Sequence, residues 1–304
     1  FKSDFKIIAE YFRAKRLNQK YKGSKEKLKH ANETLKMFSA LTGDDSFEKV
    51  YNEGNFKKGG ITMLKEKSVD IIRASEIEPK EVRWLWYPYI PYGKVTLIQG
   101  DPGDGKSTFV LNLAALLTTH RPLPFTEETR EPITVIYQNS EDDADDTVLP
   151  RFIKAGGDVS RLVFINEAEH PLTFSDERLY DAVVQENAKL LILDPLSSYI
   201  GGNVSLNMSN EVRPQFNSLI RIAKELDCAV IVVAHMNKAQ GLKALYRTTG
   251  SIDIVAAARS SLLIARTSSD KSDNERIMAV QKNNLASMGK SVLFSVGDGV
   301  VEWL

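Results

Sequence analysis

Residues 100–107 (GDPGDGKS) constrain the fold of this chain more than any other segment. They fit the pattern GxxxxGK[ST], and they lie between an apolar run, VTLIQ, and an amphipathic run, TFVLNLAALL. In a strand–loop–helix unit of this kind, the loop amides and the helix N-terminus point at one anion. The context therefore predicts a site for the phosphates of a nucleotide rather than a chance glycine-rich turn.

Within this loop, Lys106 is predicted to reach the β- and γ-phosphates, and the Ser107 hydroxyl is predicted to hold Mg²⁺. The residues expected to surround the phosphates are Asp101, Pro102, Gly103, Asp104, Gly105, Lys106, Ser107 and Thr108.

From about residue 83 onward, short apolar runs rich in β-formers alternate with longer helical patterns. The runs cover 95–99, 133–137, 162–165, 190–193, 229–234 and 261–265. Alternating strands and helices predict an α/β fold with a mainly parallel sheet covered by helices on both faces. Two later runs, 277–281 and 291–303, are predicted to form antiparallel strands that close the sheet edge. The aromatic residues before the phosphate loop are expected in the core: Trp84, Trp86, Tyr87, Tyr89 and Tyr92. The alternatives for them are packing beside a nucleotide or lining a subunit contact.

The composition is that of an ordinary globular protein, with 42% hydrophobic and 26% charged residues among 304. It excludes a disordered or fibrous chain. The apolar runs are shorter than the roughly 20 residues that a bilayer span needs, so a soluble cytoplasmic protein without membrane contact is expected. The one cysteine, Cys228, lies in an apolar run and is expected in the core, without a disulfide partner or a thiolate metal site in the chain.

The charge is unevenly distributed, although the net charge is zero. Residues 1–36 carry eleven Lys and Arg against four acidic residues. Positions Phe5, Ile8, Ala9 and Phe12 recur at helical spacing. The sequence therefore predicts a basic helical N-terminal segment and linker over 1–80, followed by the α/β domain over 81–304. The basic segment is either a solvated helical face or a contact for an anionic partner.

Two carboxylates follow apolar strands at the expected phosphate edge of the sheet. Asp194 ends the run LLIL and is predicted to orient Mg²⁺ together with Ser107; the alternative is a turn residue before Pro195. Hydrolysis needs a carboxylate that polarises water, and no Glu follows Asp194. Glu141 follows the run ITVIYQ and is the candidate base; the alternative is an acidic helix start.

His235 ends a third apolar run, VIVVA, at the same predicted edge. It is either a structural residue or a group that senses the γ-phosphate. The sequence contains no His or Cys cluster with the spacing of metal ligands, so the metal expected here is the Mg²⁺ that the nucleotide carries.

Five segments taken together resemble the RecA-like ATPases of the replicative helicase type. They are YIPYGKVTLIQGDPGDGKST, NSEDDADDTVLPRF, LLILDPLSSYIGG, VIVVAHMNK and YRTTGSIDIVAAARSSLLIAR. The nearest likeness is to the AAA-type branch of RepA-like and DnaB-like hexameric helicases, over about 82–304. This resemblance implies ATP and Mg²⁺ as cofactors, Lys106 and Ser107 as phosphate and metal ligands, Glu141 as base, Asp194 as the Walker B acid and His235 as sensor.

The resemblance also implies a ring, usually a hexamer, in which a neighbouring subunit donates a basic finger. Related proteins carry a KxR pattern after a late strand, and this chain has Lys282-Asn283-Asn284. Lys282 matches, but Asn284 occupies the arginine position. The finger is therefore missing or is supplied by Arg247 or Arg259, between which the sequence does not choose; the alternative for each is an ordinary solvated arginine.

Two segments match the loops that face the central channel in RecA-like rings, 198–212 and 237–250. In the second, Lys238, Lys243 and Arg247 are expected to contact the phosphates of single-stranded DNA. The alternative for both segments is a solvated loop.

The resemblance leads to a first hypothesis, an ATP-driven DNA motor, most concretely a replicative helicase of a plasmid, phage or integrated element. The basic N-terminal segment would then contact replication proteins. The second hypothesis is a regulatory or assembly ATPase that controls oligomerisation and protein partners without unwinding. A strand-exchange recombinase is less attractive, because residues 1–80 show no recognisable filament contact.

Overall fold

The computed structural model describes residues 72–202, 204, 209–236, 252–268 and 274–304. The chain divides into two units, Phe1–Ile77 and Glu78–Leu304. Of the first unit, the structure describes only 72–77, which include a 3₁₀ turn at Ala74–Glu76. Residues 1–71 of the basic helical segment and linker predicted over 1–80 lie outside the described residues.

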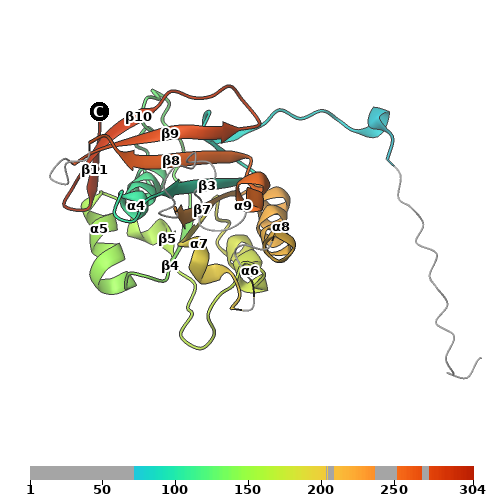
Figure 1. The fold of residues 1–304 in the computed structure, drawn as a ribbon, viewed down its shortest axis with the longest axis horizontal. Helices are drawn as coiled ribbons and strands as arrows, with labels where there is room; N and C mark the ends of the chain where they lie inside the picture. Colours follow the sequence, from blue (N-terminus) through green and yellow to red (C-terminus); the bar gives the residue numbers. More distant parts are fainter. Residues whose placement is uncertain (1–71, 203, 205–208, 237–251, 269–273) are drawn as a thin grey trace, which may run out of the picture. The chain divides into compact units, whose positions relative to one another are not determined.

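The second unit is built on a nine-stranded sheet in its described part, with the order β11-β10-β9-β8-β3-β7-β6-β4-β5 (Figure 1). The strands are β3 Val95–Gly100, β4 Val135–Asn139, β5 Leu162–Val163, β6 Leu190–Asp194, β7 Ala229–His235, β8 Ser260–Arg266, β9 Glu275–Asn283, β10 Val292–Gly297 and β11 Val300–Trp303. The pairs from β5 to β8 are parallel, and those from β8 to β11 are antiparallel. The predicted α/β fold with a mainly parallel sheet and antiparallel C-terminal strands is confirmed.

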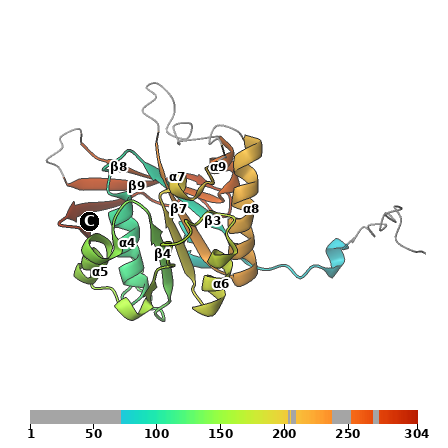
Figure 2. The ribbon, with the colours of Figure 1, turned by 90° about the horizontal axis from the view of Figure 1, so that it is seen from below.

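Helices cover both faces of the sheet (Figure 2). They are α4 Lys106–Leu117, α5 Leu149–Lys154, α6 Glu177–Gln185, α7 Leu196–Tyr199, α8 Ser209–Leu226 and α9 Ile252–Ala257, with a π-helical turn at Ala144–Val148 and a 3₁₀ turn at Val159–Arg161. Side chains of α4 and α5 belong to one core, and side chains of α6 to α9 belong to the other.

The central strands read as unbroken apolar runs because they supply both cores. In β6, Leu190 and Ile192 pack on the α4 side of the sheet, while Leu191 and Leu193 pack on the α8 side. Successive strand residues point to opposite faces, so a strand buried on both sides has no polar alternation. Cys228, just before β7, is fully buried as expected.

The aromatic prediction is only partly correct. β1 (Trp84–Trp86) and β2 (Ile90–Pro91) form a separate two-stranded sheet. Trp86 and Tyr89 are buried, and the Trp86 ring stacks on Phe109 of α4. For Tyr87 the prediction is wrong, because 60% of this residue is exposed in the turn between the two strands.

The run 162–165 was expected to be a longer strand than the structure shows. β5 ends at Val163, because the Ile165 amide donates to the Gln138 side chain, at 2.5 Å, instead of to the sheet ladder. Gln138 also donates to Glu167, whose other carboxylate oxygen accepts from the Leu172 amide.

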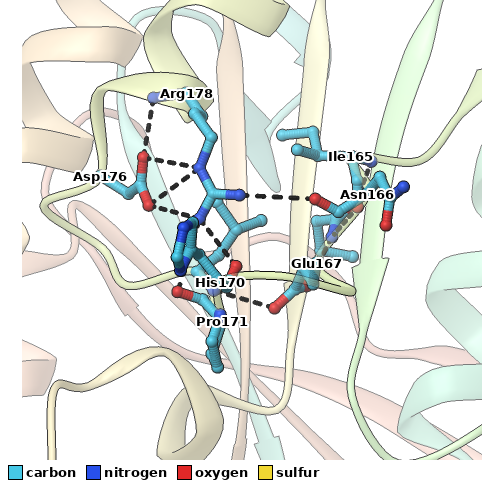
Figure 3. Close-up of polar contacts among 9 residues, drawn as sticks. Ile165, Asn166, Glu167, His170, Pro171, Asp176 and Arg178 are labelled. Carbon is cyan, nitrogen blue, oxygen red and sulfur yellow. Dashed lines mark hydrogen bonds and ion pairs between the residues drawn. The ribbon is translucent and has the colours of Figure 1, made fainter.

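Arg178 fixes the remainder of this β5–α6 connection (Figure 3). Its guanidinium donates to the Asn166 and His170 carbonyl oxygens and to the Asp176 carboxylate, with the last bond at 2.7 Å. Asp176 is also the N-cap of α6, since its Oδ1 accepts from the Arg178 amide at 2.9 Å. Hydrogen bonds from Gln138 of β4 and from Arg178 of α6 therefore hold this loop.

Candidate functional site

The glycine-rich loop joins the end of β3 to the start of α4, as its sequence context predicts. Gly105 precedes the helix with φ 88°, a left-handed conformation that favours glycine, and provides no side-chain cap. The first amides of α4 therefore remain directed at the loop, where an anion can bind them. At Gly100, a Cβ would overlap the backbone carbonyl of Ile264, so only glycine lets β3 and β8 approach here.

Lys106 is buried beneath this loop, and its Nζ donates to the Asp101 carbonyl at 2.9 Å. Burial lowers the pKa of the Lys106 ammonium, an effect that the negative charges of Asp104 and Asp194 oppose. Asp104 holds the loop from the other side, because its Oδ2 accepts from the Asp101 amide at 3.0 Å. These two hydrogen bonds hold the loop closed. Phosphate oxygens could replace the Asp101 carbonyl as the acceptor for Lys106.

The register of the parallel strands brings the other predicted residues to the same edge. Gly100 pairs with His235, and Asn139 pairs with Asp194. The carboxyl ends of β3, β4, β6 and β7 therefore lie together, in the region where open α/β sheets bind ligands.

Asp194 is almost fully buried and lies close to the start of α4. The Ser107 side chain lies close enough to its carboxylate to affect the carboxyl pKa, and the Tyr137 hydroxyl lies 3.3 Å from its Oδ2. Burial raises the pKa of the Asp194 carboxyl to about 6, while the Ser107 and Tyr137 hydrogen bonds oppose the rise. The two residues predicted to hold the metal thus lie close together.

Glu141 lies beyond the end of β4 and faces the end of β7. Its Oε1 is 3.6 Å from the His235 Nε2, and its side chain is 55% exposed, so water reaches it. The Nδ1 atom of His235 is buried without a hydrogen-bond partner in the part of the chain that the structure describes. The predicted base and the predicted sensor are therefore neighbours.

Hydroxyl and carboxylate oxygens are hard ligands of the kind that Mg²⁺ prefers. The proximity of Ser107 and Asp194, beside a buried lysine and unblocked helix amides, fits a magnesium ion carried by a nucleotide. Among the described residues, no group of three His, Cys, Asp or Glu forms a separate metal site.

Sequence reasoning missed Arg266, at the carboxyl end of β8. Its Nη2 donates to the Gly103 carbonyl at 3.1 Å, and its Nε lies 3.8 Å from the Asp104 carboxylate. Burial raises the pKa of the Asp104 carboxyl, which Arg266 and Lys106 counter. The signal was its place at the end of a strand parallel to β3, where side chains reach the same edge.

The structure does not bring Lys282 or Arg259 to this edge. Lys282 donates to the carbonyls of Val255 and Ala258 at the end of α9, at 2.8 and 2.7 Å, and burial lowers the pKa of its ammonium. Arg259 directly precedes β8, and its amide donates to the Val95 carbonyl at the start of β3. Both lie at the opposite edge of the sheet, so neither can act at the site of its own subunit.

Other predicted residues lie outside the described part of the chain. They are Lys238, Lys243 and Arg247, with the whole of the segment 237–250 and residues 203 and 205–208 of the other predicted channel loop. In the part that is described, no helix has the length and apolarity to cross a bilayer.

A family model described as AAA domain matches residues 62–241, more than half of the chain. The chain belongs to this AAA domain family. Relatives of this AAA-domain chain include the DNA repair protein RadA of Bacillus subtilis (strain 168) and that of Halalkalibacterium halodurans. Each is 26% identical over 149 residues, which are 48% of this chain and 28% of the relative. The match thus spans little more than a quarter of each relative's length.

Solved structures share the fold of the AAA-domain chain. The crystal structure of the RadB recombinase superposes with a TM-score of 0.50 at 14% identity, over 70% of this chain and 91% of RadB. A KaiC-like protein of Pyrococcus horikoshii OT3 gives 0.50 at 17% identity, over 71% and 91%. The predicted RecA-like architecture is confirmed; the narrower assignment to RepA-like and DnaB-like helicases stays a prediction.

Proposed function

We propose that the chain binds ATP with Mg²⁺ at the loop 100–107 and hydrolyses its terminal phosphoanhydride. The observation that carries this proposal is the convergence of Lys106, the Ser107–Asp194 pair and the Glu141–His235 pair on one sheet edge. The membership of the AAA domain family supports it.

In this mechanism, Lys106 exchanges the Asp101 carbonyl for phosphate oxygens, and the amides at the start of α4 bind the same anion. Ser107 and Asp194 would hold the magnesium ion, which would supply positive charge to the phosphates. Glu141 accepts a proton from the attacking water. The water oxygen bonds to the γ-phosphorus, the bond to the bridging oxygen breaks, and ADP and phosphate leave. His235, whose Nε2 lies 3.6 Å from the Glu141 Oε1, would sense the γ-phosphate.

Steady-state hydrolysis by the purified chain tests this reaction, with Lys106→Ala as the blank. We expect magnesium-dependent phosphate release that the blank lacks. Equal rates for the two proteins would refute the assignment, because the Lys106 ammonium is the main positive charge expected at the phosphates.

We further propose that hydrolysis drives a ring-forming DNA motor, with single-stranded DNA in the channel of a hexamer and a replicative helicase of a mobile element as the specific form. The names of the relatives, DNA repair proteins, and the order of the five motifs support a DNA-associated role. Lys238, Lys243 and Arg247 would hold the DNA backbone, and the basic segment within 1–80 would contact replication proteins.

A regulatory or assembly ATPase is the second candidate. Asn284 at the expected arginine position and the use of Lys282 as a cap of α9 favour it, because both weaken the case for a KxR finger.

Single-stranded DNA separates the two candidates. A motor predicts that DNA accelerates hydrolysis, that the acceleration fades as salt rises, and that Lys243→Ala and Arg247→Ala reduce it. Hydrolysis that ignores DNA at every salt concentration would favour the regulatory ATPase.

A further inference from the structure

A series of hydrogen bonds joins Asp194 of β6 to the loop after β4, and its first link is Tyr137 of β4. Tyr137 is fully buried, and its ring meets Phe164 edge-on with centroids 6.4 Å apart. Its hydroxyl lies 3.3 Å from the Asp194 Oδ2 and 3.1 Å from the Asn139 Nδ2. Tyr137 and Asn139 are two residues apart on one strand, so their side chains leave the same face.

Asn139 continues the series into the backbone. Its Oδ1 accepts from the amides of Glu141 and Asp142, each at 2.8 Å. The series therefore runs without a break from the predicted magnesium acid, Asp194, to the backbone of the predicted base, Glu141. The Ser140 amide, which donates to the Asp194 carbonyl at 3.3 Å, supports the same alignment.

The backbone amides determine which group donates and which accepts in each hydrogen bond of this series. Since two N–H donors face one end of the Asn139 side chain, that end is the oxygen, and the NH₂ group faces Tyr137. The phenol oxygen then accepts from Asn139, and its proton points at Asp194. An aspartate at position 139 would keep both amide contacts but could not donate to Tyr137 unless protonated.

We propose that Tyr137 and Asn139 are positioning residues that hold Glu141 in register with Asp194, so that base and metal acid form one rigid unit. The inference rests on the proposed hydrolysis. Neither residue is assigned a contact with a reacting atom. Their effect is through geometry, and a displacement of about 1 Å at a reacting group is enough to cost on the order of 100-fold in rate.

Tyr137→Phe tests the first link, because it keeps the ring and removes only the hydroxyl. We expect kcat for ATP to fall about 10-fold or more while KM changes less than about 3-fold, since the Lys106 loop is untouched. The matched control is Tyr89→Phe. This variant also loses a hydroxyl hydrogen bond, the 2.9 Å bond to the Lys290 carbonyl. That bond lies outside the hydrogen-bond relay from Asp194 through Tyr137 and Asn139 to Glu141, so Tyr89→Phe should keep the wild-type rate.

Amide hydrogen exchange supplies a readout that does not depend on turnover. In Tyr137→Phe, the Asn139 side chain loses one of its anchors, so a peptide covering 139–143 should exchange faster than in the wild-type protein. The peptide covering 106–117 should not change. If Tyr137 serves only in core packing, Tyr137→Phe should keep both the wild-type kcat and the wild-type amide exchange rate of the 139–143 peptide.

The pair is tested by a double-mutant cycle with Asn139→Ala. A relay predicts that the double variant is no slower than the slower single variant, because either substitution breaks the same series. Wild-type kcat in Tyr137→Phe, or effects that multiply in the double variant, would overturn the proposal. If Tyr137→Phe does not fold, Asn139→Ala at the half-buried position carries the test through its kcat and the same exchange measurement.

Failure of the proposed reaction is distinguishable from failure of the relay. If the wild-type protein hydrolyses no more ATP than Lys106→Ala, the proposed function is refuted and the positioning role with it. If the wild-type protein is active and both variants match it, only the relay is wrong.

Discussion

At the scale of single residues, the site separates a buried carboxylate, the proposed metal ligand, from an exposed one, the proposed base. Asp194 lies beneath two hydroxyl groups, where burial raises the pKa of its carboxyl to about 6, whereas Glu141 is open to solvent at the rim. The separation suits their roles. A metal ligand benefits from a fixed, partly desolvated position, and a base that receives a proton from water must reach that water.

Glu141→Gln is therefore expected to stop turnover and spare binding. The amide keeps the size of the side chain but cannot accept the proton, so kcat should fall about 100-fold or more with the ATP dissociation constant nearly unchanged. Phosphate release and binding of a fluorescent ATP analogue measure the two quantities. Turnover near the wild-type rate would move the base to another residue.

Arg266 acts at the same scale, through the phosphate loop. Its bond to the Gly103 carbonyl and its ion pair with Asp104 hold the loop, so Arg266→Ala should weaken nucleotide binding by up to about 10-fold while the fold remains intact. Isothermal titration with ATP measures the change. Arg266→Lys keeps the charge and loses the forked guanidinium, and it should recover only part of the affinity.

At the scale of elements, the features that could be predicted from the sequence are those formed by residues close together in the chain. Strands β6 and β7 were predicted because burial on both faces makes each a nearly unbroken apolar run, and Lys106, Ser107 and Asp194 were singled out because each belongs to a local motif. Arg266 and the contact between Tyr137 and Asp194 were missed because their partners are set by strand register. The use of Lys282 as a cap of α9 was missed for the same reason, since residues 255 and 282 are joined only by the fold.

The β5–α6 connection shows how one residue can fix an element. Asp176 caps α6 and binds Arg178, so Asp176→Ala should lower the free energy of unfolding by about 1 kcal/mol at neutral pH. Urea unfolding measures the loss. Asp181→Ala, at an exposed position of the same helix, is the matched control and should stay within about 0.5 kcal/mol of the wild-type protein.

This stabilisation depends on pH with a definite sign. The hydrogen bond from Arg178 lowers the pKa of Asp176 in the folded protein. The stabilisation is therefore complete above the ordinary aspartate pKa of about 4 and is lost as the pH falls through the lower folded value. The gap between the wild-type protein and Asp176→Ala should narrow in acid. A gap that widens there would contradict the assignment.

At the scale of the whole molecule, the basic residues considered for catalysis lie at opposite ends of the parallel strands. Lys106 and Arg266 lie at the phosphate edge, while Arg259 lies where β8 begins. An arginine at the far edge can serve hydrolysis only at the site of another subunit. If Arg259 is the finger, the active unit is an interface between two copies, as in a head-to-tail ring.

Mixing two inactive variants tests this directly. Arg259→Ala keeps an intact phosphate loop, and Lys106→Ala keeps an intact arginine, so each alone should be nearly inactive. In a random 1:1 mixture, about a quarter of the head-to-tail interfaces combine the intact halves, and hydrolysis should return in that proportion. The same mixture with Arg247→Ala assigns the finger between the two arginines. Arg259→Ala with wild-type activity would exclude Arg259, and two inactive variants that never complement would place its effect within one subunit.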